Sequence, residues 1–238
     1  MSLRPQADVQ AVQDTLLPSC LQTAGKNSDE IFRYLSHQAR TAGYGNTLFH
    51  LRQVTVMSVK ENRIDAAEKK QLLEWVQRLE VEMRLVFGED ERRIKHALRV
   101  AAFAEELLEG EPADPYVVMA AAYLHDIGIH EAERKHGSAA GKYQEIEGPP
   151  IAEAILRKMG APQGMVDEVC EIVAYHHSPG KVQTANFAVL WDSDWLVNLP
   201  DEHPNLSKEK LRKIIDAVFL TESGRRLACG IYLPDEGE

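Results

Sequence analysis

Four short segments of the chain carry histidine or aspartate side chains whose chemistry suits a metal ion. The first is the pair His125 and Asp126, which stands where the wholly apolar segment 116–124 ends. Unpaired polar groups in such a place cost about 1–3 kcal/mol each. An imidazole beside a carboxylate is a ready pair of metal ligands, and a bound ion compensates for their desolvation. Alone, the pair is also typical of a helix end with a capping aspartate.

The other three segments lie far from this pair along the chain. His96 belongs to an inward-facing apolar stripe of a predicted helix. His176 and His177 end another helix and project about 100° apart, so they can contact two neighbouring metals, or one metal and its substrate. Asp194 lies on the apolar face of a later helix, and Asp192 is the competing ligand nearby. Each of these residues alone can also be a hydrogen-bonded core residue.

Helices must position these side chains, because apolar residues recur at helical spacing almost everywhere and strand-like alternation is scarce. We therefore predict an all-α fold. Gly88 is the one candidate boundary, and it separates an N-terminal helical segment, 1–88, from a main domain, 89–238. The segment 128–148 reads as a polar loop, after which Pro149 and Pro150 begin a helix. The remaining helices are expected at 47–60, 65–87, 89–108, 114–126, 162–177, 185–198 and 207–221.

The charge and composition of the chain argue against some classes of binding partner. The 27 basic and 37 acidic residues give a net charge of −10, which repels phosphate backbones. We therefore expect neither a nucleic-acid polymer nor a membrane surface as partner, although a small anionic substrate can still bind beside a metal ion. The sequence contains no apolar run long enough to cross a bilayer and no secretory pattern at its start, so a cytoplasmic location is expected. Its three cysteines form no disulfide framework and no CxxC pair.

The order of the segments resembles the HD domain superfamily of metal-dependent phosphohydrolases. The resemblance covers about residues 90–200, and the YLHDIG stretch at 123–128 is its most recognisable part. It implies a helical bundle and a metal ion bound by four residues, namely His96, His125, Asp126 and Asp194. Asp194 is preferred to Asp192 because Ser-Asp-Trp-Leu at 193–196 is similar to the family's Ala-Asp-x-Leu pattern.

A second metal ion is implied by similarity to the HD-GYP branch. His176 and His177 match that branch's histidine pair, and Glu147 stands where the branch has a further histidine. A carboxylate can replace imidazole as a ligand of manganese or iron. Two divalent ions are therefore expected, drawn from iron, manganese, magnesium, nickel and zinc. The Gly-Tyr-Pro signature is absent after the pair, which does not favour hydrolysis of cyclic dinucleotides.

Catalytic and substrate-binding residues are predicted in the same way. Asp126 is expected to bridge the two ions, in line with the family. The family's frequent lysine after His-Asp-x-Gly is Ile129 here, and His130 follows it. His130 is therefore predicted to assist the leaving group, although a solvated loop histidine is an equally good interpretation. Arg134 and Lys142 are candidates for binding phosphate, although a solvated charge run is the plainer interpretation.

The predicted function is metal-assisted hydrolysis of a small phosphorylated substrate, such as a nucleotide. In this chemistry bound ions lower the pKa of water and polarise phosphoryl oxygens. Two alternatives use the same residues: an HD-fold diiron oxygenase, and a non-catalytic metal-containing regulatory module with residues 1–88 as its partner surface. A homodimer formed through the N-terminal helices also stays open.

Overall fold

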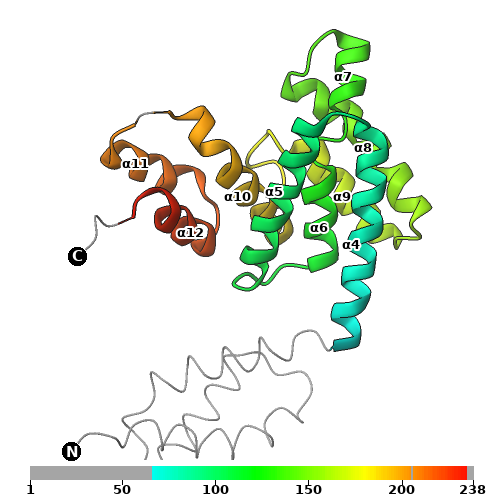
Figure 1. The fold of residues 1–238 in the computed structure, drawn as a ribbon, viewed down its shortest axis with the longest axis horizontal. Coiled ribbons are helices and arrows are strands. Elements are labelled where there is room, and N and C mark those ends of the chain that lie inside the picture. Colours follow the sequence, from blue (N-terminus) through cyan, green and yellow to red (C-terminus); the bar gives the residue numbers. More distant parts are fainter. Residues whose placement is uncertain (1–65, 205, 235–238) are drawn as a thin grey trace, which may run out of the picture. The chain divides into compact units, whose positions relative to one another are not determined.

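The computed structural model describes residues 66–204 and 206–234, and these are helical with turns and no strand. The predicted all-α class is confirmed. No helix in this part of the chain combines the length and the apolar character that a bilayer crossing requires. Figure 1 shows the arrangement of the helices, whose bounds are α4 Ala66–Phe87, α5 Glu91–Leu108, α6 Pro115–Leu124, α7 Ile129–His136, α8 Gly141–Lys158, α9 Gln163–Tyr175, α10 Ala185–Glu202, α11 Lys208–Val218 and α12 Glu222–Tyr232.

Helix α6 is the centre of the domain. Asp114 caps its first turn by accepting hydrogen bonds from two backbone N–H groups, and Pro115 occupies the first helical position, as predicted. Every residue from Val117 to Leu124 is buried, and α5, α9 and α10 pack around the helix. Because α6 is apolar on all sides, only the middle of a helical bundle can accommodate it. The end of α6, where His125 follows, is thereby fixed inside the domain.

Helices α4 and α5 meet at a tight turn. Gly88 takes the left-handed conformation with φ 60°, and Asp90 caps α5 by accepting from the backbone N–H of Arg93. Leu79, Met83 and Phe87 of α4 are buried in the same core as α5 and α6. The described compact unit reaches N-terminally to Lys70. The boundary at Gly88 stays a prediction, because most of segment 1–88, including the predicted helix 47–60, lies outside the described residues.

Most of the segment 128–148 is helical, whereas we predicted a polar loop. Helix α7 covers Ile129–His136, and α8 already begins at Gly141, so Pro149 and Pro150 lie inside α8 rather than at its start. Proline removes the N–H donors that would bond the carbonyls of Glu145 and Ile146. Ile146 is 60% exposed, so water can serve as the donor there. Helix α12 was not predicted at all.

Two glycines allow α8 to cross the turn between α6 and α7. A Cβ atom on Gly128 would lie 2.4 Å from the backbone nitrogen of Gly148 and 2.8 Å from the carbonyl oxygen of Gln144. A Cβ on Gly148 would in turn lie 2.7 Å from a methyl carbon of Val173 on α9. The HD-x-Gly segment therefore contacts α8 backbone to backbone. This contact sets the distance between the end of α6 and the helices that follow.

We predict that Gly128→Ala lowers the free energy of unfolding by at least about 2 kcal/mol, because the added methyl group overlaps backbone atoms that cannot move independently. Gly164→Ala is the matched control, since a Cβ there meets nothing within 4 Å. That change should be neutral or stabilising by up to about 1 kcal/mol. Urea denaturation of both variants provides the measurement. Equal stability of the two variants would contradict the close crossing.

Candidate metal centre

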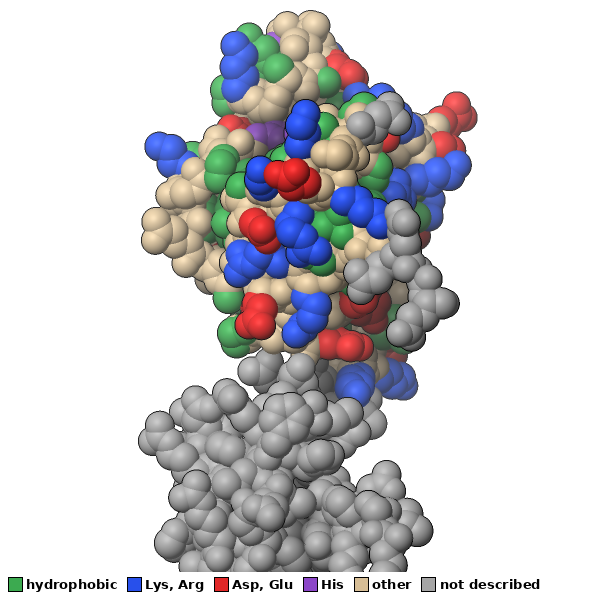
Figure 2. Space-filling model, turned by 90° about the vertical axis from the view of Figure 1, so that its left-hand side faces the viewer, with side chains coloured by type: hydrophobic (Ala, Val, Ile, Leu, Met, Phe, Trp, Pro, Cys, Tyr) green, Lys and Arg blue, Asp and Glu red, His purple; other side chains and the backbone are tan. Residues whose placement is uncertain are grey.

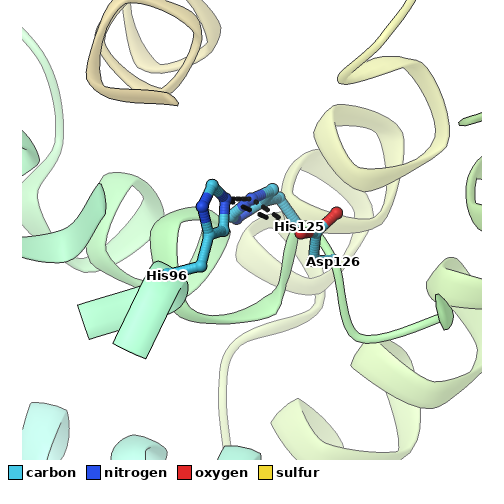
Figure 3. A group of neighbouring side chains, drawn as sticks. All are labelled: His96, His125 and Asp126. Carbon is cyan, nitrogen blue, oxygen red and sulfur yellow. Dashed lines mark hydrogen bonds and ion pairs between the residues drawn. The ribbon is translucent and has the colours of Figure 1, made fainter. Parts of the chain in front are cut away.

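Side chains from three helices meet in one group. The Nε2 atom of His96, from α5, lies 3.1 Å from Nε2 of His125 and 3.0 Å from Oδ1 of Asp194, which belongs to α10. Oδ2 of Asp126 lies 3.6 Å from both histidine nitrogens. Ligand atoms that share an ion at about 2.1 Å are separated by about 3.0–3.4 Å in octahedral or tetrahedral geometry. The observed spacing therefore suits a common ion, and Figure 3 shows the side chains of His96, His125 and Asp126 converging.

Backbone carbonyls set the orientation of the two most buried imidazoles. Nδ1 of His125 bonds the Ala122 carbonyl at 2.9 Å, and Nδ1 of His176 bonds the Val173 carbonyl at 2.7 Å. A carbonyl can only accept, so each Nδ1 must carry the proton, and each Nε2 offers its lone pair when the ring is neutral. Nε2 of His176 is buried without any hydrogen-bond partner. A buried imidazole nitrogen that lacks a hydrogen-bond partner, in a ring whose orientation is fixed, suits a metal ligand.

A second group shares Asp126 with the first. Nε2 of His176 lies 3.6 Å from Oδ1 of Asp126, and the ring of His177 lies beside it with a centroid distance of 4.0 Å. Ligand atoms of Asp126, His176 and His177 fall within 4.8 Å of one another. The two oxygens of Asp126 thus face different histidines: Oδ2 faces His96 and His125, and Oδ1 faces His176. This is the arrangement that a bridging carboxylate requires.

The two groups are deep on one side and open on the other. His125 is 1% exposed, whereas the side chains of His96, Asp126 and Asp194 retain 16–20% of their exposure. The buried nitrogens therefore form the floor of the site, and a small molecule can approach from the open side.

Burial and mutual charge shift the pKa values of these groups in opposite directions. Burial, reinforced by neighbouring histidines, lowers the pKa of His125. Burial and the charge of His176 lower the pKa of His177 to about 4. Burial alone would raise the pKa of Asp126, but the surrounding imidazoles outweigh it and hold this pKa below its ordinary value. The site therefore keeps an ionised carboxylate among imidazoles that can bind a cation.

Asp194, rather than Asp192, lies beside His96. Nδ2 of Asn198, one turn later on α10, donates to Oδ1 of Asp194 at 2.9 Å and helps to orient it. Asp192 is fully buried and accepts three hydrogen bonds, at 2.7–2.8 Å, from the backbone and hydroxyl donors of Leu220 and Thr221. These hydrogen bonds therefore hold the Asp192 carboxylate on the side of α10 opposite to Asp194.

Glu147 is not brought into either group of described residues. Its Oε2 pairs with Nζ of Lys135 at 2.6 Å, and its Oε1 bonds Nε2 of His136 at 2.9 Å. These two partners from α7 hold the pKa of Glu147 below its ordinary value. The carboxylate fastens α7 to α8, and its predicted role as a metal ligand stays a prediction.

The three residues that we predicted to act in catalysis or substrate binding, on α7 and α8, also have partners. Nε2 of His130 lies 3.1 Å from Oδ2 of Asp90, the cap of α5. Arg134 pairs with Glu131 on its own helix at 2.6 Å, and the ammonium of Lys142 lies 4.6 Å from the ring centre of Tyr143. None of these contacts joins the residue to the metal groups. Their catalytic and substrate-binding roles stay predictions.

Two residues near the site were missed by sequence reasoning. Asn198 supports Asp194, and the signal was its spacing of four residues from that aspartate on one helix. Arg99 is exposed and lies one turn after His96 on α5. Its positive charge lowers the pKa of His96 and so opposes the nearby carboxylates, which raise it. It makes no ion pair with the described residues. A basic side chain beside the first histidine can attract an anionic substrate.

Comparison with known proteins agrees with this geometry. The family profile of the HD domain matches residues 93–219, more than half of the 238-residue chain. The chain belongs to the HD domain family. The HD domain thus extends from α5 to the end of α11 and contains the residues of both groups.

Similarity outside the family profile is limited. Among solved structures, the crystal structure at 1.45 Å of a "predicted HD superfamily hydrolase" from an uncultured Thermotogales bacterium is 24% identical and has a TM-score of 0.49. The match covers 66% of this chain and 84% of that one. No curated protein matches.

Protons should compete with metal ions for this HD site. Burial lowers the pKa of His96 and of His176, but the negative charges of the neighbouring Asp194 and Asp126 outweigh it, so both pKa values are raised. Below these raised pKa values the imidazoles are protonated, and an incoming ion must displace the protons. We predict that Mn²⁺ affinity falls as the pH drops from 8 to 6, and that the fall approaches about tenfold per pH unit for each displaced proton once the pH lies below the raised pKa values.

Calorimetric titration in buffers of different ionisation enthalpy measures this affinity and the number of protons released. A Mn²⁺ affinity that stays constant between pH 8 and pH 6, with no proton release, would contradict imidazole ligation.

Proposed function

We propose that this HD domain protein hydrolyses a small phosphoester with the help of divalent metal ions. The observation that carries the proposal is the position of Asp126, whose two oxygens face His96 and His125 on one side and His176 on the other. The orphaned Nε2 of His176 and the mixed nitrogen and oxygen donors suit divalent transition-metal ions.

Some residues would bind the metal ions, and others would orient these ligands. His96, His125, Asp126 and Asp194 would hold one ion, and Asp126 with His176 and His177 a second. When bound, such ions lower the pKa of water and polarise phosphoryl oxygens. The carbonyls of Ala122 and Val173 would keep the imidazoles in the metal-binding tautomer.

A negatively charged substrate is supported by the surroundings of the opening. The chain as a whole carries a net charge of −10, which would repel anions. Arg99 lies next to His96 on the exposed side of α5 and makes no ion pair with the described residues, so its charge is available to a phosphoryl group. A guanidinium can bind two phosphate oxygens at once. We therefore expect a substrate with an accessible phosphoryl group.

We predict that Asp126→Asn removes bound metal and lowers phosphoester hydrolysis by more than about 100-fold, because losing an outer-shell partner alone typically costs about 10- to 100-fold in metal affinity or activity. The measurement combines metal analysis with hydrolysis of p-nitrophenyl phosphate and bis(p-nitrophenyl) phosphate in the presence of Mn²⁺. Asp167→Asn is the matched control, since Asp167 is exposed on α9 and accepts a hydrogen bond from Gln163 on the same helix.

Each alternative function has its own outcome in this experiment. A metal-loaded protein that is inert towards phosphoesters but consumes dioxygen with an organic substrate would replace the proposal with a diiron oxygenase. A protein that binds metal without either reaction would favour a regulatory module. Unchanged hydrolysis in Asp126→Asn would show that the reaction does not use this site.

A further inference from the structure

The helix that carries Asp194 lacks one of its own hydrogen bonds. Pro200 lies inside α10, and its missing N–H leaves the carbonyl of Leu196 without its usual donor. The hydroxyl of Tyr232, the last residue of α12, donates to this carbonyl instead. Burial raises the pKa of Tyr232, which keeps the hydroxyl protonated as a donor. The backbone two residues after Asp194 therefore depends on α12 for its hydrogen bond.

A second contact joins α12 to the other side of Asp194. The carboxylate of Asp192 accepts from the backbone N–H of Thr221 at 2.8 Å and from its hydroxyl at 2.7 Å. The same hydroxyl caps α12 by accepting from the N–H of Gly224 at 2.8 Å. A Cβ on Gly224 would lie 2.2 Å from Oδ2 of Asp192, so the helix start is pressed against this carboxylate. The two contacts hold α10 two residues before and two residues after Asp194.

Helix α12 lies after the part of the chain that matches the family profile. The HD domain profile ends at residue 219, and α12 covers Glu222–Tyr232. Figure 1 shows α11 and α12 together beside α10. Figure 2 views the molecule from the side of these helices, where basic and acidic side chains are mixed. Helix α12 contacts α10, and its exposed side chains include Glu222, Arg226 and Ile231.

We propose that α12 is a positioning element for the metal centre, and that Thr221 and Tyr232 act through α10 to hold Asp194 against His96. The steps of this coupling follow along α10. Asn198, which donates to Asp194, lies between Leu196 and Pro200, the residues whose local geometry Tyr232 stabilises. A rotation of this turn would move both the carboxylate and its supporting amide away from Nε2 of His96, now 3.0 Å from Oδ1.

This inference rests on the proposed metal site, and its test measures metal affinity directly. The variants are Thr221→Val and Tyr232→Phe, each of which removes one hydroxyl at nearly constant shape. Thr184→Val is the matched control: Thr184 caps α10 as Thr221 caps α12, but it lies ten residues before Asp194. Calorimetric Mn²⁺ titration gives affinity, and thermal unfolding gives stability for each variant.

We expect Thr221→Val and Tyr232→Phe to weaken Mn²⁺ binding by about tenfold or more. Thr184→Val should lower the melting temperature and leave the affinity unchanged, while Thr221→Ser, which keeps the hydroxyl, should bind like the wild type. Wild-type affinity in both Thr221→Val and Tyr232→Phe would overturn the role of α12 and leave the metal site standing. Equal weakening in Thr184→Val would overturn it as well, and absence of Mn²⁺ binding to the wild type would overturn both proposals.

Discussion

The crowding of ligand-type atoms between α5, α6 and α10 is the constraint on which the structure depends. The imidazole nitrogens of His96 and His125 lie 3.1 Å apart, and each lies 3.0–3.6 Å from carboxylate oxygens of Asp126 and Asp194 in a partly buried place. Without a cation, ionised carboxylates this deep raise the free energy of the fold through desolvation. A divalent ion satisfies the oxygens and nitrogens together. The metal centre is therefore the simplest physical reason for these side chains to meet.

The rest of the domain serves to keep these atoms in place. Helix α6 is buried along its length, so the His125–Asp126 pair cannot shift without disturbing the core. The Gly128–Gly148 crossing sets α8 against that pair, and the carbonyls of Ala122 and Val173 fix two ring orientations. Contacts with backbone atoms therefore fix most of the positions of the ligand side chains, and these backbone atoms have little freedom to move.

The sequence predicted residues that lie close together in the structure, although it placed the elements around them less well. The His-Asp pair at the end of an apolar helix and the later Asp194 were weak signals separately, and the order of the segments, which resembles the HD family, singled them out; their role as metal ligands stays a prediction. The second half of the polar segment was missed, since Pro149 and Pro150 indicated a helix start while the helix had begun at Gly141. Pairings such as Glu147 with Lys135, or Tyr232 with Leu196, join distant segments and leave no local signal.

The most direct test of the central claim is a crystal structure of the protein loaded with a divalent ion whose anomalous scattering identifies it. We predict an ion about 2.0–2.2 Å from Nε2 of His96 and His125 and from carboxylate oxygens of Asp126 and Asp194. An ion bound elsewhere, or no ion between these four side chains at saturating concentration, would contradict the account.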